Sequence, residues 1–368
     1  AATTRLSENA LKAYIDTERD FFANPSSVHG EGIRAHKELE RNRERIASLL
    51  SVPASSLFFT SGATESIAAV FSSLLLAEPG KVIISAIEHE AVSSWLRPLE
   101  SHGWKTARLK AKGGFVKKED LEAELTPDTR LVAIMAVNNV TGAIEDTAGL
   151  IGTVREYEKN LKHRIFFFAD SVQALGKIPY GIASLDIDGA SFSAHKLNGP
   201  RGIGMLYLKR PEAFRAIAPA GGQEKGKRGG TENLPAIAGF RAALEEWIPD
   251  AAANQARIAS LNARIRDAIT SAGLKVLSPE NASPYIISFA SPLPSEVYTR
   301  MLSDKGISAS SGSACSNNTK GEGERILLAM GFRSSEAKQA VRISLSNASD
   351  EESVDTLIEA IKEIGNGR

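Results

Sequence analysis

The residue with the clearest chemical potential is Lys196, at the centre of the segment 191–204 (SFSAHKLNGPRGIG). It lies between a β-rich run and a turn that contains Gly199, Pro200 and Gly202. Such a turn can hold a lysine over a binding site, and a lysine amine becomes a nucleophile when its surroundings lower its pKa. Schiff-base formation with a carbonyl cofactor is the best-known use of that amine. Taken alone, the simpler interpretation is a solvated surface lysine, because most lysines are exposed.

A second feature is the segment 61–65 (SGATE), between a short apolar strand and a helix of small residues. Free backbone N–H groups and the helix dipole would there point at whatever lies ahead of the helix. The segment therefore indicates an anion-binding site. The alternative is a plain strand-to-helix turn with Thr64 as the N-cap.

The chain has a single cysteine, Cys315, within the segment 308–323 (SASSGSACSNNTKGEG). A lone cysteine is usually a small buried residue. The Ser, Gly and Asn neighbours supply no apolar pocket, so we expect an exposed, mobile loop. One cysteine excludes an internal disulfide and fits a reducing compartment, which predicts a cytoplasmic protein.

Composition excludes several other classes of protein. The 368 residues are 42% hydrophobic and 24% charged, with a formal net charge of zero. This is ordinary globular composition, and it offers no electrostatic reason to expect nucleic acid or an anionic membrane as a partner. No apolar run reaches the roughly 18 to 20 residues that span a bilayer.

Alternating strands and helices must position the chemically active residues. The periodicity predicts strands over 57–60, 81–85, 105–109, 131–137 and 164–169, and helices over 31–50, 66–76, 91–101, 118–124, 147–161 and 234–247. This alternation predicts a mostly parallel sheet covered by helices on both faces. Ligands of such sheets bind beyond the carboxyl ends of the strands. Polar residues follow several of those ends: His89, Asn138, Asn139, Asp170, Gln173, His195 and Lys196.

A second, smaller domain is predicted after a long helix over 252–272. It would contain strands over 285–289 and 341–345 and helices over 296–304, 324–330 and 352–364. The overall expectation is an α/β fold with a seven-stranded type of sheet in a large domain over 13–250. Residues 1–12 and 251–368 would form a small α+β domain that carries the cysteine loop. Residues 1–28 match neither regular period.

The ordered set of motifs resembles the cysteine desulfurase family, the NifS/IscS-like branch of the class V, fold-type I enzymes that use pyridoxal 5′-phosphate (PLP). The resemblance runs along nearly the whole chain. It is carried by 24–27 (NPSS), 60–65 (TSGATE), 88–89 (EH), 137–139 (VNN), 170–173 (DSVQ), 193–196 (SAHK), 228–231 (RGGT), 311–315 (SGSAC) and 341–345 (VRISL). Each motif is weak alone, and the ordered set is specific.

This resemblance implies a PLP site in which Lys196 forms the Schiff base with the cofactor. Asp170 would pair with the pyridinium nitrogen, which makes the ring an electron sink. Gln173 would hydrogen-bond the phenolic oxygen, and His89 would stack on the ring and assist proton transfers. The cofactor phosphate would be bound by Ala63, Thr64, Ser193 and His195.

The resemblance also implies how substrate and subunits meet. Asn139 and Arg342 would hold the substrate α-carboxylate, since an Arg fork can bind a carboxylate through two bonds. Asn138 is the one-residue alternative to Asn139. Thr231 would reach the phosphate of the neighbouring subunit, which implies a homodimer with shared sites.

The implied activity is removal of sulfur from L-cysteine to give L-alanine. Lys196, together with His89, would move the α-proton, and the Cys315 thiolate would take the sulfur as a persulfide. The sulfur would pass to an acceptor, such as a scaffold protein for Fe-S cluster assembly. The resemblance implies no metal.

Two departures from the family pattern leave the sulfur acceptor open. The usual Asn-Glu-Ile-Gly after the asparagine pair is replaced by Val140-Thr141-Gly142, and the sequence after Cys315 is SNNTKGEGER. Alternative activities within class V are those of an aminotransferase, a selenocysteine lyase, or a cysteine or cystine C–S lyase. A non-enzymatic subunit that retains the cofactor and binds a scaffold would lack the lysine or the cysteine, and both are present.

Overall fold

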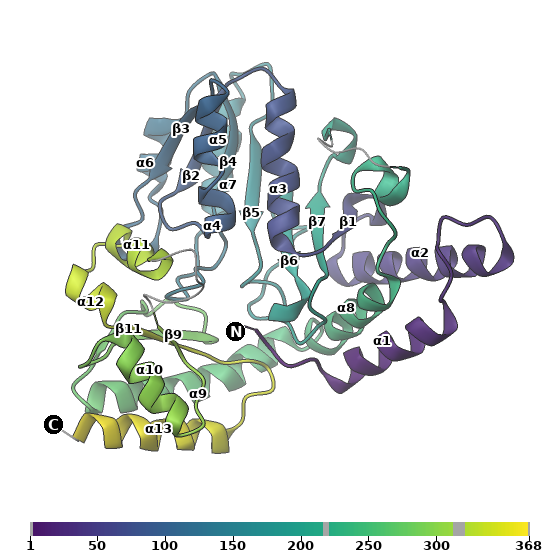
Figure 1. Cartoon of the computed structure of the whole chain (residues 1–368). Coiled ribbons are helices and arrows are strands. Elements are labelled where there is room, and N and C mark those ends of the chain that lie inside the picture. The colour runs from purple at the N-terminus through teal and green to yellow at the C-terminus, as the bar shows by residue number, and fades with distance from the viewer. Residues whose placement is uncertain (1–2, 216–220, 312–320, 367–368) are drawn as a thin grey trace.

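The computed structural model describes residues 3–215, 221–311 and 321–366. These residues form two units, each built on its own sheet (Figure 1). The large unit holds a sheet of seven strands in the order β1-β7-β6-β5-β4-β2-β3. Its strands are β1 (Leu57–Thr60), β2 (Lys81–Ser85), β3 (Lys105–Leu109), β4 (Thr129–Ala133), β5 (Phe166–Asp170), β6 (Gly189–Ser193) and β7 (Gly204–Leu208).

The large sheet is mostly parallel. The five neighbouring strands from β3 to β6 pair in parallel, and β7 runs antiparallel to both β6 and β1. The predicted α/β class is therefore confirmed. The apolar runs in these strands are continuous because helices cover both faces, so every residue of β5 after Phe166 is buried.

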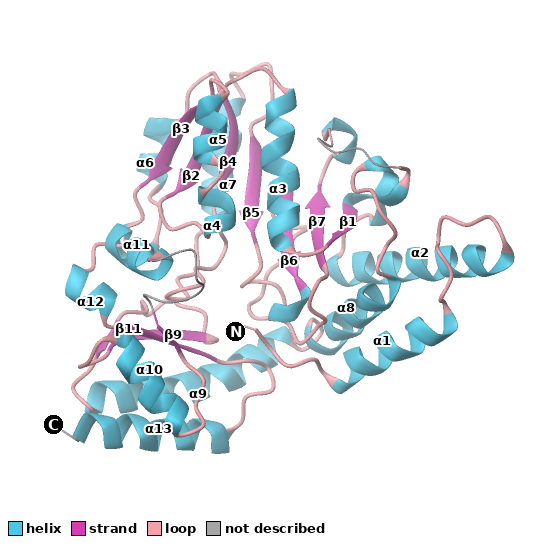
Figure 2. Ribbon diagram, viewed as in Figure 1, coloured by secondary structure: helices cyan, strands magenta, loops and turns pink. Residues whose placement is uncertain are grey.

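Alternate residues of the central strands enter two different cores. Phe167 packs on one face with residues of α2 (Gly30–Leu50), α7 (Thr147–Glu158) and α8 (Leu234–Trp247). Phe168 packs on the other face against α3 (Ala63–Ser73) and the short helices α4 (Glu90–Ser93) and α5 (Leu96–Ser101), which flank the sheet in Figure 2. The period of two along a strand accounts for this division.

Three sequence-based element predictions were wrong. The predicted helix over 91–101 is two short helices, because Pro98 inside one continuous helix would clash with the carbonyl of Ser94. The predicted strand over 131–137 ends at Ala133. Residues 1–28 contain α1 (Glu8–Asp20), in which only Ala10 and Thr17 are buried, so the sequence presents no long apolar stripe.

The small unit contains a four-stranded antiparallel sheet in the order β10-β11-β9-β8. The strands are β8 (Lys275–Val276), β9 (Ile286–Ala290), β10 (Ser310–Ser311) and β11 (Ala340–Ser344). Two long helices, α9 (Ala251–Ser271) and α13 (Glu351–Asn366), lie side by side beneath β9 and β11 (Figure 1), and α10 (Ser295–Asp304) adds Tyr298 and Leu302 to the same core.

Two segments that the sequence assigned to the small domain contact the large unit. Thr4 N–H donates to His195 O at 2.9 Å, and α1 packs along α8. Ile326 and Leu327 of α11 (Glu322–Ala329) belong to the core of the large unit, as does Ala337 of α12 (Ser334–Lys338).

The helix α6 (Lys118–Glu124) completes the large unit. Among the described residues, no helix is both long enough and apolar enough to span a bilayer.

Candidate active site

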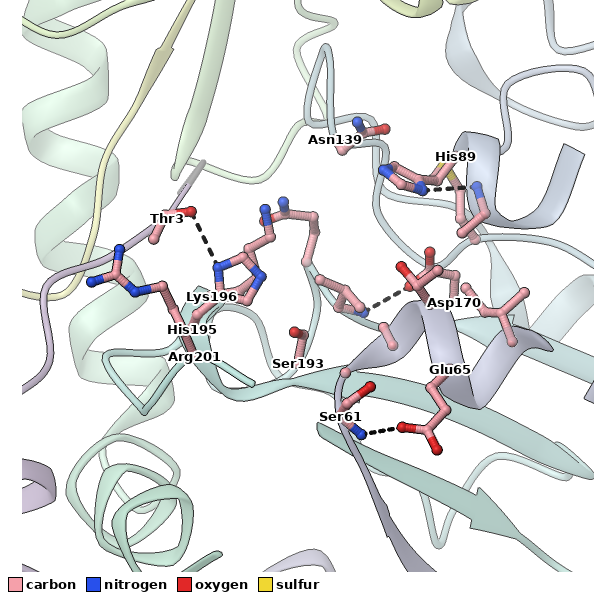
Figure 3. A pocket seen from close by; sticks show the side chains of 18 of the residues that line it. Thr3, Ser61, Glu65, His89, Asn139, Asp170, Ser193, His195, Lys196 and Arg201 are labelled. Atoms are coloured by element: carbon pink, nitrogen blue, oxygen red, sulfur yellow. Dashed lines mark hydrogen bonds between the residues drawn. The ribbon is translucent and has the colours of Figure 1, made fainter. Parts of the chain in front are cut away.

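A cavity of about 530 Å³ opens beyond the carboxyl ends of β4, β5 and β6. Residues from the large unit form most of its wall (Figure 3). Arg342 of β11 reaches the cavity from the small unit. The cavity brings together ten of the predicted site residues: Ala63, Thr64, His89, Asn139, Asp170, Gln173, Ser193, His195, Lys196 and Arg342. The expectation that they meet at one edge of the parallel sheet follows from the strand order.

The N-terminus of α3 forms one end of the cavity. Its N-cap is Gly62 rather than Thr64, and this glycine supplies no side chain to the first turn of the helix. Gly62 also packs closely on β7, since a Cβ on Gly204 would lie 2.5 Å from its Cα. Residues of the first turn of α3 line the cavity, where the unpaired N–H groups of a helix N-terminus can receive an anion.

Glu65 orders the turn before α3. Its Oε2 accepts a hydrogen bond from Ser61 N–H at 2.5 Å, and its Oε1 lies 3.0 Å from Arg228 Nε. Burial raises the pKa of Glu65, but the Ser61 hydrogen bonds and the Arg228 ion pair together lower it below the usual range. An ionised Glu65 thus links the anion-binding turn to the loop that carries Arg228.

The residues after β6 place Lys196 and His195 at the cavity. Ser193 ends the strand and a 3₁₀ turn over Ala194–Lys196 follows. His195 Nδ1 lies 3.1 Å from Thr3 Oγ1 (Figure 3). Burial, and then the charges of Lys196, Lys177 and Arg201, lower the pKa of His195 to about 4, so its imidazole is neutral at neutral pH.

Asp170 ends β5 and is buried at the floor of the cavity. Its Oδ1 accepts Val172 N–H at 3.1 Å and Ser191 Oγ at 3.4 Å. Burial raises the pKa of Asp170, and the charges of His89 and Lys196 act in the opposite direction. A buried carboxylate with both of these hydrogen bonds on one oxygen can use its second oxygen to bind a cationic group.

His89 is the N-cap of α4. Its Nδ1 accepts Ala91 N–H at 3.1 Å, which leaves Nε2 as the ring nitrogen that carries the proton in the neutral form. Nε2 lies 4.0 Å from Glu322 Oε1 at the start of α11. The imidazole is thus held in one tautomer at the cavity wall.

Asn138 and Asn139 have different roles in the structure. Asn138 is buried away from the cavity, donates from Nδ2 to Ile87 O at 3.1 Å and accepts Val140 N–H at 2.9 Å. Asn139 lines the cavity, and its buried Oδ1 has no hydrogen-bond partner within the described part of the chain. Arg342 Nη1 donates to Asn139 O at 2.9 Å. Of the two asparagines, Asn139 is the one available to a ligand.

Comparison with known proteins agrees with this geometry. The profile of the family described as Aminotransferase class-V matches residues 1–357. The chain belongs to the class-V aminotransferase family. A NifS/IcsS protein homolog from Lactobacillus delbrueckii subsp. bulgaricus is 37% identical over 373 residues, which cover 99% of this chain and 95% of the relative.

Further relatives and structures support this membership of the class-V family. A cysteine desulfurase from Trichormus azollae is 35% identical over 375 residues, which cover 99% of this chain and 91% of the relative. A solved structure titled as a NifS-like protein superposes with a TM-score of 0.91 at 34% identity, covering 99% of this chain and 97% of that one. The predicted family resemblance is confirmed.

Two predicted residues of this class-V chain are not part of the described cavity. Thr231 is exposed outside it, and its Oγ1 accepts from Asn24 Nδ2 at 3.5 Å. Cys315 lies outside the described residues. Described residues on both sides of it approach the site: Ser310 Oγ accepts from Arg342 Nη2 at 3.0 Å, and Glu322 Oε1 accepts Glu90 N–H at 2.9 Å.

Sequence reasoning missed several residues at the site. Thr3 and Arg201 line the cavity, and Glu88 and Lys177 lie buried beside it. Glu88 is adjacent to His89 in the sequence, and Lys177 follows Gln173 by four residues, so proximity to a predicted residue was the available signal. Thr3 meets His195 across 192 residues of chain, and no local pattern could have revealed that contact.

Proposed function

We propose that this protein is a PLP-dependent cysteine desulfurase that converts L-cysteine to L-alanine and keeps the sulfur on Cys315 as a persulfide. The observation that carries the proposal is that Lys196, the buried Asp170 and the anion-binding end of α3 all line one cavity. Relatives named cysteine desulfurase that align over 99% of the chain support the same substrate.

The class-V family depends on PLP, and the residues at this cavity fit that group. The N-terminus of α3 offers backbone N–H groups to a phosphate, and Lys196 offers an amine to an aldehyde. Asp170 offers a buried carboxylate to a pyridinium nitrogen. The buried Oδ1 of Asn139 has no hydrogen-bond partner among the described residues, so it can accept a hydrogen bond from a bound molecule.

When bound, PLP supplies an electron sink for negative charge that develops on the substrate carbons. Lys196 and His89 both line the cavity, and in this proposal the Lys196 amine takes the α-proton with His89 Nε2 as a second group able to move a proton. Arg342 donates to Asn139 O and Ser310 Oγ at the cavity, and in this proposal its guanidinium binds the substrate carboxylate. Asp170 would hold the ring nitrogen protonated.

The sulfur transfer balances without an external oxidant. The thiolate of Cys315 attacks the substrate sulfur, and an S–S bond forms as the substrate C–S bond breaks. The electron pair of the broken bond stays with carbon, which takes up a proton and leaves as alanine. The two sulfurs are oxidised to a persulfide as that carbon is reduced. An Fe-S scaffold protein is the expected acceptor of the sulfur.

A homodimer would complete the site through Thr231. Large apolar side chains gather near this threonine: Phe22 is 76% exposed and Val28 is 92% exposed in the single chain. Asn24 lies between them in sequence and donates to Thr231 Oγ1. Exposed apolar side chains of this size indicate a surface that another protein covers. We therefore place the two-fold interface at this surface.

Mass spectrometry after incubation with L-cysteine tests the proposed function. We expect one added sulfur on Cys315 and one alanine for each sulfur released to a thiol acceptor. Cys315→Ala should keep the coenzyme absorbance and lose alanine formation, with Ser313→Ala as the matched control. Full alanine production by Cys315→Ala would rule out the persulfide on Cys315. A preference for selenocysteine over cysteine as the substrate would indicate a selenocysteine lyase.

A further inference from the structure

A buried lysine lies directly behind the cavity. The side chain of Lys177 is 2% exposed, and the charged groups that act most strongly on it are two cations, Lys196 and Arg342. Burial, followed by the charges of these two residues, lowers the pKa of Lys177 well below its usual value. Burial beside these two cations therefore favours the uncharged form of the Lys177 amine.

The backbone turn after β5 directs this amine back toward Gln173. Lys177 N–H donates to Ala174 O at 3.1 Å, and Gly176 adopts a φ of +67°. A Cβ on Gly176 would lie 2.6 Å from Leu197 Cδ1, so this close approach to the segment after Lys196 requires glycine. As a result, Lys177 Nζ lies 2.6 Å from Gln173 Oε1.

This hydrogen bond gives the two ends of the Gln173 amide different surroundings. The Lys177 amine has N–H groups to donate in its charged and uncharged forms, and the amide oxygen is the end that faces it. Gln173 lines the cavity, whereas Lys177 does not. An amide oxygen held by Lys177 leaves the NH₂ as the end of Gln173 that can donate to another group.

We propose that Lys177 is a positioning residue, which holds the Gln173 amide oxygen so that the amide NH₂ donates to an acceptor oxygen on the coenzyme ring. The inference rests on the proposed function, since it takes PLP as the bound group. Without Lys177 the Gln173 amide can turn over. Its oxygen, rather than its NH₂, would then face the acceptor oxygen of the coenzyme ring. An N–H donor stabilises the negative charge that remains when the bound coenzyme loses its proton. Loss of the donor therefore favours the protonated coenzyme.

The test is the pH midpoint of the visible absorption change of the bound coenzyme. Lys177→Met removes the donor and keeps an unbranched side chain that is one atom shorter. We expect its midpoint to rise by about 1 to 2 pH units, the size of one hydrogen bond to a charged group. Lys159→Met, at a side chain that is 68% exposed, is the matched control and should not move the midpoint.

A double-mutant cycle separates orientation from a direct effect of the lysine. Gln173→Ala should raise the midpoint as Lys177→Met does, and the double variant should shift no further than either single variant. Additive shifts, or an unchanged midpoint in Lys177→Met, would overturn the proposal. Lys177→Gln keeps a donor and should shift less than the methionine variant; an equal shift also counts against it. Should the methionine variant fail to fold, the cycle is run with Lys177→Leu, which also removes the donor.

The same experiment distinguishes this inference from the proposed function. If the wild-type protein binds no coenzyme with a visible band, the proposed function fails. If the wild type shows the band and its pH change but Lys177→Met has the same midpoint, the proposed function stands and the role of Lys177 is refuted.

Discussion

Replacing Glu224 by glutamine removes the negative charge from a buried ion pair of the large unit. The Oε1 and Oε2 atoms of Glu224 accept from the two terminal nitrogens of Arg43, each at 2.8 Å, and the two side chains are 1% and 3% exposed. Glu224 Oε2 also accepts Phe59 N–H in β1 at 2.8 Å. The substitution preserves the shape of the side chain but leaves a buried guanidinium without this counter-charge.

The expected loss follows from that burial. Removing one partner of a buried ion pair costs about 3 to 5 kcal/mol in the free energy of unfolding. Glu40 lies 3.1 Å from Arg43 and remains as a partial counter-charge, so we expect a loss of about 3 kcal/mol, at the lower end of the range. At about 2 to 4 °C per kcal/mol for a large domain, the melting temperature should fall by about 6 to 12 °C.

The pair also holds an unusual backbone. Glu224 and Lys225 adopt φ values of 45° and 56°, a left-handed conformation that costs non-glycine residues energy. This loop leads to Arg228, which pairs with Glu65 at the anion-binding turn. Glu224→Gln should therefore also weaken phosphate binding at the end of the cavity that the N-terminus of α3 forms.

Thermal unfolding followed by circular dichroism measures the effect. Lys159→Gln is the control, because Lys159 pairs with Glu156 at 2.6 Å and both side chains are exposed, at 68% and 74%. Exposed pairs contribute little, so this variant should change the free energy of unfolding by less than about 0.5 kcal/mol. A loss below about 1 kcal/mol in Glu224→Gln, or one equal to the control, would refute the reasoning.

Three further predictions concern the site and the assembly. Lys196→Ala should abolish the coenzyme adduct that borohydride traps, and an adduct on another lysine would contradict the assignment. Burial raises the pKa of Glu88 from 4.5 to about 8, so its contribution to stability is complete below pH 4.5 and is lost as pH rises through 8. Glu88→Gln should flatten this decline in denaturant unfolding measured across that range; an unchanged slope would contradict the raised pKa. Val28→Asp should convert a dimer to monomers in sedimentation, because an interface would bury the new carboxylate. Leu76→Asp should remain dimeric, and a dimeric Val28→Asp would argue against the proposed interface.

Much of the site could be predicted from the order of elements along the chain. Apolar runs such as β5 are buried on both faces, and polar residues follow them at the carboxyl ends. Because parallel strands share one carboxyl edge, Asp170 and Lys196 were expected to meet there, and both line the cavity. The helix α1 was missed because its short apolar pattern acquires meaning only where it packs on α8.

The sequence by itself determined the fold class, the family and the residue types at the cavity, since these depend on periodicity and on motifs a few residues long. Tertiary structure alone decided which asparagine faces the ligand. Asn138 donates to Ile87 O, which lies 51 residues earlier in the chain, and this contact leaves Asn139 at the cavity wall. It also decided that Glu224 and Arg43, 181 residues apart, form a buried pair. Burial and hydrogen bonding between distant segments depend on how the sheet and helices pack, and no local pattern records them.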